Sequence, residues 1–387
     1  RSSVRFQLDL PLVPDTTPLT IQGKPSPIRV IGGVIYFLFL LLLFFVSIEL
    51  MGTTFEMFGG RGLADQLLSL ASNPVSGLLI GFLATSLVQS SSTTTTLVVI
   101  MVGAGTIDIG LAVPIVMGAN IGTTTTNTIV SLGHVTRPAE FERAFAASTV
   151  HDFFNVLAAF TLLPLEVYLH PIERTAVRLQ GMFADAAGGV GWDSPLKALR
   201  DPPADFIAGM VTNPFVLLIL ALALLLLALR GLLVLMRGAV LERVSGLFDR
   251  VLFRNDAASF ALGVAATATV QSSSATTSLI VPLAGTGVLS LRQIFPYTIG
   301  ANIGTTITAI LASLGTGSAA AMIVALAHLT FNVFAVLIFY PLKALPIWLA
   351  TGWGAFAARS KAGTATVLSV YVALHVIPLA FIFLARG

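Results

Sequence analysis

One polar motif occurs twice in this chain, each time inside apolar sequence. Gln-Ser-Ser-Ser stands at residues 89–92 and again at 271–274. Gly-Ala-Asn-Ile-Gly-Thr-Thr stands at residues 118–124 and again at 300–306, so both parts repeat at the same offset of 182 residues. Hydroxyl and amide groups are costly in an apolar environment unless something polar needs them. The repeat therefore predicts one site that is built from two related halves.

The apolar sequence around these motifs predicts an all-α polytopic membrane protein. Hydrophobic residues make up 56% of the chain and charged residues only 10%. Several continuous apolar runs, such as 28–51 and 214–235, reach the roughly 20 residues that a helix needs to cross a bilayer. With a net charge of +3 and no basic stripe, no nucleic-acid partner is expected. The lack of cysteine excludes disulfides, thiolate metal sites and thiol catalysis.

The repeat extends well beyond the motifs and predicts two structural units. Residues 81–133 and 263–315, aligned without gaps, are identical at 26 of 53 positions. The arms flanking each Gln-Ser-Ser-Ser are too short to cross a bilayer, which favours a re-entrant helical hairpin with its polar tip at mid-membrane depth. Each unit is expected to contain a span, a hairpin, a span interrupted at the Gly-Ala-Asn-Ile-Gly-Thr-Thr motif, and a further span. The predicted segments are an N-terminal tail (1–28), a first repeat (29–170, hairpin about 75–104), an external loop (171–207), a second repeat (208–342, hairpin about 257–286) and a C-terminal segment with a last span (343–387).

The number of crossings predicts that the second unit is inverted relative to the first. Three full crossings separate equivalent points of the two units. If the N-terminus is cytoplasmic, fourteen Lys and Arg residues lie in inner segments and six in outer segments, in agreement with the excess of positive charge on the cytoplasmic side. Inverted repeats with broken helices are typical of secondary transporters. We expect an integral plasma membrane protein, with the bacterial inner membrane as its location.

The predicted core lacks basic side chains, which restricts how it could hold an anion. No Lys or Arg lies between Arg61 and Arg137 or between Arg254 and Arg292. An anion at the hairpin tips would depend on the N-terminal ends of the second hairpin arms and on bound cations. The many neutral oxygens suit a hard cation, and Asp152 adds one carboxylate, whereas the matching residue of the second repeat is apolar. This balance of charge indicates an anion transporter that is coupled to a monovalent cation.

Longer motifs resemble the type II sodium-dependent phosphate cotransporters and their bacterial relatives. Beside the two duplicated motifs, the similarity includes the stretch from Glu-Arg-Ala-Phe at 142–145 through Val-His-Asp-Phe-Phe-Asn at 150–155 to Leu-Pro-Leu-Glu at 163–166. It covers about residues 75–335. The resemblance implies sodium-coupled import of inorganic phosphate by alternating access. Because family members with aspartate at the position of Asp152 are electrogenic, it also implies about three sodium ions per divalent phosphate.

The resemblance also assigns expected site residues, and no organic cofactor. The residues expected to bind phosphate at the tips are Gln89, Ser90, Ser91, Ser92, Thr93, Ser272, Ser273, Ser274, Asn120 and Asn302. The residues expected to bind sodium are Gln271, Ser272, Ser273, Thr305 and Thr308, with Asp152 and Asn155 at another sodium site and with Gln89 and Thr123 in the first repeat. The protein is expected to be a monomer or a homodimer.

Four alternatives compete with this interpretation. The small and polar residues could serve only to pack membrane helices. The same architecture could carry another oxyanion, such as sulfate or arsenate, or a carboxylate. An intramembrane hydrolase using Ser91 or Ser273 with His151 is disfavoured, because no Gly-x-Ser-x-Gly turn is present and an enzyme has no need of two equivalent serine triplets, so the chain is not expected to be an enzyme. A channel is disfavoured by the sealed hairpin tips.

Overall fold

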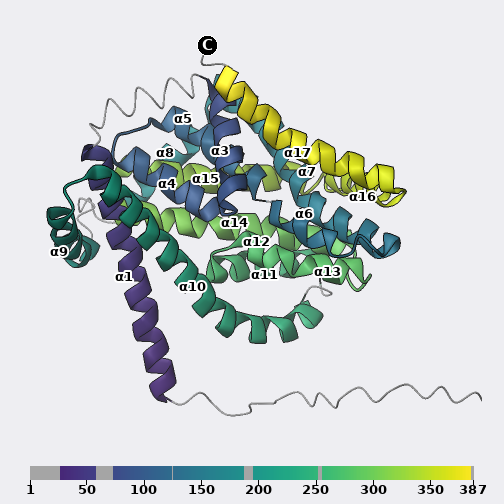
Figure 1. Ribbon diagram of the computed structural model, residues 1–387, viewed down its shortest axis with the longest axis horizontal. Helices are drawn as coiled ribbons and strands as arrows, with labels where there is room; N and C mark the ends of the chain where they lie inside the picture. The colour runs from purple at the N-terminus through teal and green to yellow at the C-terminus, as the bar shows by residue number, and fades with distance from the viewer. Residues whose placement is uncertain (1–26, 58–72, 124, 187–194, 252–254, 385–387) are drawn as a thin grey trace, which may run out of the picture.

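The computed structural model describes residues 27–57, 73–123, 125–186, 195–251 and 255–384. All regular structure in these ranges is helical (Figure 1). The helices are α1 (Pro27–Met57), α3 (Pro74–Val88), α4 (Ser91–Gly103), α5 (Ile109–Gly122), α6 (Thr125–Leu132), α7 (Pro138–Leu169), α8 (Pro171–Ala186), α9 (Pro195–Met210), α10 (Pro214–Val251), α11 (Asp256–Val270), α12 (Ser273–Ser278), α13 (Ile280–Gly285), α14 (Leu291–Thr316), α15 (Ala319–Phe339), α16 (Ala344–Ala358) and α17 (Lys361–Leu384).

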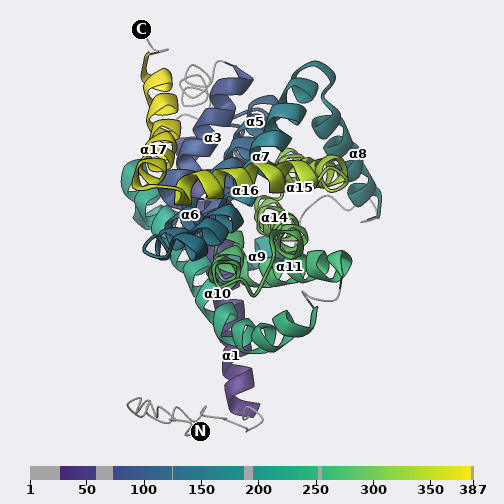
Figure 2. The same ribbon diagram turned by 90° about the vertical axis from the view of Figure 1, so that its right-hand side faces the viewer.

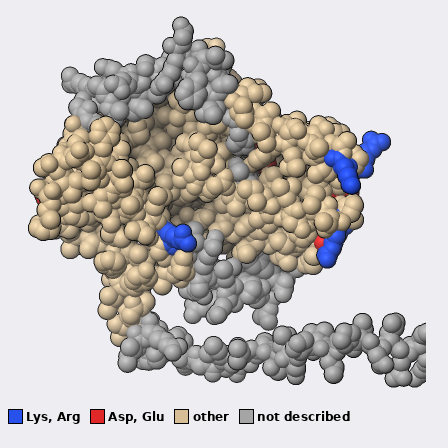
Figure 3. All heavy atoms as spheres, viewed as in Figure 1, with Lys and Arg blue, Asp and Glu red and all other residues tan. Residues whose placement is uncertain are grey.

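The expected class, an all-α polytopic membrane protein, is confirmed. Six stretches are long and apolar enough to cross a membrane: Ile31–Phe55, Ile109–Leu132, Pro138–Leu169, Pro214–Leu232, Leu291–Thr316 and Ala319–Phe339. The helices that flank the two polar tips, α3, α4 and α11, are apolar but shorter. Figure 3 shows a face that has few charged side chains in its described part, with Lys and Arg at the right-hand edge and in one further patch near the middle. Such a surface suits contact with lipid.

The two halves of the chain use the same helix contacts. In the first half α3 packs along α5, and in the second half α11 packs along α14 (Figures 1 and 2). The helix that follows each half then packs on the other half: α8 lies against α15, and α16 lies against α7. This exchange holds the halves together around the buried residues of α5, α7, α14 and α15.

Glycines at matching positions allow the α3–α5 and α11–α14 pairs to approach closely. A Cβ on Gly118 would stand 1.8 Å from the carbonyl oxygen of Leu78, and one on Gly300 would stand 2.2 Å from the carbonyl oxygen of Phe260. The partner atoms belong to the backbone, so no side-chain movement could relieve either contact. The alternative in which the small residues pack helices is therefore correct for these glycines, whatever the polar residues beside them do.

The interruption expected in the second repeat does not occur, and the one expected in the first falls at residue 124, which lies outside the described residues. Helix α5 ends at Gly122 and α6 begins at Thr125, whereas α14 runs from Leu291 to Thr316 without a break. The sequences differ just after the motif, where Asn127 in the first repeat corresponds to Ala309 in the second. Within α14 the hydroxyls of Thr305 and Thr306 donate to the backbone oxygens of Ala301 and Ile303, so the polar residues of the motif are accommodated inside a continuous helix.

Three further segments differ from the expected outline. The loop 171–207 contains the helices α8 and α9, and each begins with a proline, which favours the first turn of a helix. Helix α10 continues beyond the apolar run 214–235 as far as Val251. The C-terminal segment contains α16 before the expected last span. The N-terminal tail expected at 1–28 falls almost entirely outside the described residues.

Candidate functional site

The two Gln-Ser-Ser-Ser tips have the same backbone conformation. Gln89 ends α3 with a φ of 58°, and Gln271 ends α11 with a φ of 57°. This left-handed region is unfavourable for a residue other than glycine, by about 1 kcal/mol or more. The next residue caps the following helix in both halves: the Ser90 hydroxyl accepts from the N–H of Thr93, and the Ser272 hydroxyl accepts from the N–H of Ala275. The sequence repeat is thus also a repeat of a strained turn that starts a helix.

The tips lie against each other across the two halves. The Ser92 hydroxyl at the start of α4 donates to the backbone oxygen of Gln271, 3.1 Å away. The Ser274 hydroxyl at the start of α12 donates to the backbone oxygen of Thr123, where α5 ends, also at 3.1 Å. The structure therefore brings together the two tips and the C-terminal end of α5, in contacts between residues about 150 to 180 positions apart in the chain.

The polar residues in the first turns of α4 and α12 are buried. Ser91, Ser92, Thr93, Ser273 and Ser274 are all buried. The first N–H groups of a helix lack partners within the helix and, with the helix dipole, favour an anion. Among the described residues no Lys or Arg contacts either tip through a hydrogen bond or an ion pair. The tips can therefore offer an anion hydroxyls and backbone N–H groups, but no fixed positive side chain.

Asn120 and Asn302 form the centre of a buried amide and imidazole network. Asn302 Oδ1 lies 2.6 Å from His151 Nε2, and Asn302 Nδ2 donates to Asn155 Oδ1 at 2.7 Å. Asn155 Nδ2 in turn donates to the backbone oxygen of Asn120 at 2.8 Å. On the other side, Asn120 Oδ1 lies 3.4 Å from His328 Nε2. Each half thus contributes a histidine that faces the asparagine of the other half. Because both asparagine amides are engaged in this way, phosphate binding by them would require the network to open.

The residues expected to bind sodium lie in two related groups. Thr305 donates its hydroxyl to Ala301 in α14 (3.0 Å), and Thr123 donates its hydroxyl to Ala119 in α5 (3.1 Å). The Thr308 hydroxyl is fully buried and has no hydrogen-bond partner among the described residues. No hydrogen bond joins Thr305 or Thr308 to Gln271, Ser272 or Ser273 in that part of the chain, although α14 packs against α12.

The sequence interpretation missed Thr126, which is the equivalent of Thr308 in the first repeat. Thr126 donates its hydroxyl to the side-chain oxygen of Gln89, 3.0 Å away. At the repeat offset of 182, Thr126 and Gln89 correspond to Thr308 and Gln271. Extending the repeat comparison to the sodium residues would have identified Thr126. The pair Asn127 and Thr277, bonded at 2.9 Å, was also missed, and it has no equivalent in the repeat that could have revealed it.

Asp152 lies apart from the tips. It lines an apolar pocket with residues of α3, α5, α7, α16 and α17, and it makes no hydrogen bond or ion pair with any residue that the structure describes. Asn155, its expected partner at one sodium site, is instead bonded to Asn120 and Asn302. Asp152 and Asn155 therefore lie on the same helix, α7, but their side chains are not hydrogen-bonded to each other.

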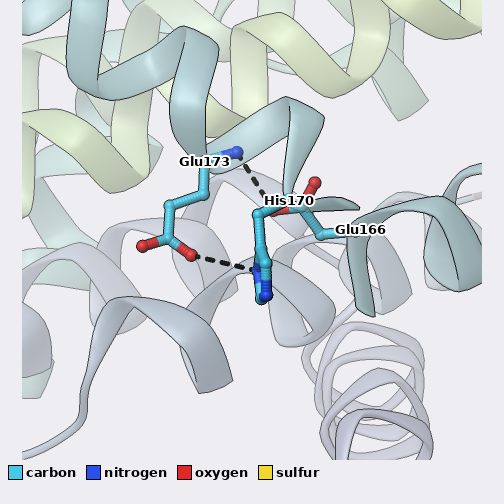
Figure 4. Close-up of side chains that lie close together, drawn as sticks. All are labelled: Glu166, His170 and Glu173. Atoms are coloured by element: carbon cyan, nitrogen blue, oxygen red, sulfur yellow. Dashed lines mark hydrogen bonds and ion pairs between the residues drawn. The ribbon is translucent and has the colours of Figure 1, made fainter. Parts of the chain in front are cut away.

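Glu166 has a structural role at the corner between α7 and α8. Its carboxylate accepts from the backbone N–H groups of Ile172 (2.7 Å) and Glu173 (3.0 Å), which caps the start of α8. Figure 4 shows Glu166, His170 and Glu173 together, and their ligand atoms lie within 4.8 Å of one another. His170 Nδ1 is 3.6 Å from Glu173. Because both Glu166 oxygens serve the backbone, the grouping is explained by capping rather than by a metal ion.

The second hairpin is also held at its base. Asp256, at the start of α11, accepts from the Tyr340 hydroxyl at 3.0 Å and forms an ion pair with Lys343. The Lys343 ammonium and the Tyr340 hydroxyl hold the pKa of the Asp256 carboxyl below its usual range. This contact joins the beginning of α11 to the end of α15.

Comparison with known proteins assigns the family. The profile of the Na+/Pi-cotransporter family matches residues 43–172 and 216–345, which together form most of the chain. The chain belongs to this family. The two matched stretches contain one polar tip each, in agreement with an internal duplication.

Several curated relatives are similar over most of the chain. It is 32% identical to the sodium-dependent phosphate transport protein 2B of Pongo abelii over 433 residues, covering 86% of this chain and 62% of the relative. It is 34% identical to the sodium-dependent phosphate transport protein 2A of Ovis aries over 406 residues, covering 83% of this chain and 63% of the relative. The chain thus spans less than two thirds of the length of these relatives. No solved structure matches it.

Proposed function

We propose that this protein is a sodium-coupled symporter that imports inorganic phosphate, and that it is not an enzyme. The observation that carries the proposal is the contact between the two tips, which have the same backbone conformation and meet through Ser92 and the backbone of Gln271. The relatives of this chain are named as sodium-dependent phosphate transport proteins. Phosphate would bind between the starts of α4 and α12, to the hydroxyls and N–H groups of residues 89–93 and 272–274. Sodium, as a second substrate, would supply the positive charge that the side chains do not.

The proposed sodium sites follow the two related groups of oxygens. In the second half these are Gln271, Ser272, Ser273, Thr305 and Thr308, where the buried and unpartnered Thr308 hydroxyl supports a ligand role. In the first half they are Gln89 and Thr123, to which the contact of Thr126 with Gln89 adds a third residue. Asp152 would hold a further ion, with Asn155 if the amide network opens.

The proposed transport cycle is alternating access between two inverted halves. The matched helix contacts of the two halves, and the exchange of α8 and α16 between them, support a duplicated architecture that can be exposed to either side in turn. The His151–Asn302 and His328–Asn120 contacts cross between the halves, so they are the polar contacts that would have to change during the cycle. We further propose that the N-terminus is cytoplasmic and that the location is the bacterial inner membrane.

The function can be tested with purified protein in liposomes. We expect radiolabelled phosphate uptake to require an inward sodium gradient and to increase when the interior is made negative. An equal gradient of potassium is the control and should support no uptake above that of empty liposomes. Uptake that is indifferent to sodium would contradict the proposal. Unlabelled sulfate or arsenate that competes better than phosphate would identify a different oxyanion as the substrate.

Replacing Asp152 with glycine is expected to abolish charge movement and to retain phosphate uptake. One sodium ion fewer would accompany each divalent phosphate, so the cycle would become electroneutral. The measurement is sodium-driven uptake at zero and at negative interior potential, with the transport current recorded in parallel. The control is Phe160→Gly, a highly exposed position on the same helix, which introduces the same glycine but should leave the dependence on potential unchanged. Potential-dependent uptake by the Asp152 variant would show that another group sets the charge of the cycle.

A further inference from the structure

The pocket that Asp152 lines is a separate cavity. It has a volume of about 360 Å³, which lies within the range of small-molecule sites. None of the residues of the two Gln-Ser-Ser-Ser tips lines it. The residues that line it belong to α3, α5, α7, α16 and α17. The pocket therefore lies where α16, which follows the second half, packs on α7 of the first half.

The lining combines one acid with several aromatic rings. Asp152 is the only charged residue among those that line the pocket, and no Lys, Arg or His faces it there. The rings are those of Phe82, Phe145, Phe153, Trp353 and Tyr371. Aromatic faces attract cations, and an acid in apolar surroundings is stabilised by a positive partner. The lining therefore favours an organic cation over an anion or a neutral polar molecule.

The pocket opens toward the apolar surface of the protein. Val156 on α7 is 38% exposed, and Val370 and Leu374 on α17 are 39% and 56% exposed, whereas Phe145 and Val367 deeper in the pocket are buried. Helix α7 is itself a candidate membrane span over its whole length, Pro138–Leu169. A ligand would therefore enter from the hydrocarbon of the bilayer, which requires it to be lipophilic as well as positively charged.

We propose that this pocket binds lipophilic organic cations, with the cationic nitrogen beside Asp152 and the apolar groups among the aromatic rings. The consequence for transport rests on the function proposed above. If Asp152 holds a transported sodium ion, an organic cation in the pocket competes with that ion and inhibits sodium-driven phosphate uptake. A monoaryl quaternary ammonium ion has the charge, the aromatic ring and a size that suit the cavity.

The proposal is tested first by direct binding to the full chain in lipid nanodiscs. The probe is radiolabelled benzyltriethylammonium in potassium buffer, and its uncharged analogue with carbon in place of nitrogen serves as the matched ligand. We expect saturable binding of the cation that is weakened roughly tenfold or more by Asp152→Asn, and weaker binding of the analogue by a similar factor. Added sodium should displace the cation.

Two tryptophan substitutions locate the site. Val370→Trp places a large side chain in the mouth of the pocket and is expected to abolish probe binding. Leu337→Trp, at an exposed position of α15 away from the pocket, should leave probe binding unchanged. Size-exclusion profiles of both variants establish that each is folded, so a loss of binding by Val370→Trp alone supports this location.

The outcomes separate this inference from the function on which it partly rests. Three outcomes would each overturn the inference: no saturable binding, equal binding of the uncharged analogue, or unchanged binding by Asp152→Asn. Equal binding of the analogue would indicate that a lipid chain occupies the pocket. Binding that needs Asp152 but is indifferent to sodium would support the pocket and contradict the sodium role of Asp152. Because binding is measured without transport, failure of sodium-driven uptake would not alter its result.

Discussion

Replacing Gly118 with alanine is expected to destabilise the protein severely and to abolish its transport. The added Cβ would stand 1.8 Å from the carbonyl oxygen of Leu78 and 2.9 Å from the backbone nitrogen of Phe82, so α3 and α5 would have to separate. Forced overpacking of this kind costs about 1–3 kcal/mol and occasionally more, which exceeds the gain of up to about 1 kcal/mol from alanine in a helix. Separation of α3 would also displace Gln89 and its tip. The measurement is the apparent melting temperature of purified protein in detergent, together with phosphate uptake in liposomes.

A matched pair of variants controls for the substitution itself. Gly300→Ala, the equivalent change in the second half, would place its Cβ 2.2 Å from the carbonyl oxygen of Phe260 and is expected to be similarly harmful. Gly52→Ala in α1 meets no atom within 4 Å and should leave the melting temperature unchanged or slightly higher. If Gly118→Ala were as stable as Gly52→Ala, the close packing of α3 on α5 would be refuted.

Replacing Asn302 with alanine is expected to be the most harmful single loss of a polar side chain in the core. The change removes the partner of both His151 Nε2 and Asn155 Oδ1, which are buried. Each of these two buried polar groups left without a partner costs about 1–3 kcal/mol, so the expected loss of unfolding free energy is about 2–6 kcal/mol. The measurement is again the apparent melting temperature, accompanied by phosphate uptake, which we expect to fall with it.

The control for Asn302 is another asparagine of the same network region. Asn332 is equally buried, but within the described part of the chain its side-chain nitrogen donates only to the backbone oxygen of His328 in its own helix, at 2.9 Å. Asn332→Ala therefore breaks no contact between the halves and should cost clearly less. An equal or larger effect of Asn332→Ala would mean that the contacts between the halves do not dominate the energetics of this network.

The parts of the site that depend on residues close together in the chain could be predicted from the sequence. Gln89 and Gln271 are followed by the same three serines, so the same turn and helix cap form twice from the same short-range interactions. The pairing of the tips is less local, and the sequence could indicate only that two equal halves would meet. That Ser92 contacts the backbone of Gln271, whereas Ser274 contacts Thr123, depends on how α4 and α12 pack.

The second interrupted span shows why a repeat alone can mislead. The motif suggested an interruption, but α14 runs from Leu291 to Thr316 without a break, and the hydroxyls of Thr305 and Thr306 bond to carbonyl oxygens of their own helix. Polar residues in an apolar run therefore do not by themselves predict where a helix ends. The glycines of the motif allow close contacts between helices, as the alternative of helix packing by small residues suggested.

The sequence by itself determined the all-helical membrane class, the duplication and the chemical character of the tips, because these follow from the length of apolar runs and from residues that are neighbours in the chain. Only the tertiary structure decided that Asn302 faces His151, that α8 and α16 exchange between the halves, and that Asp152 lines an aromatic pocket apart from the tips. The physical reason is that these contacts join segments far apart in the chain. Their geometry depends on how whole helices pack, which no local pattern encodes.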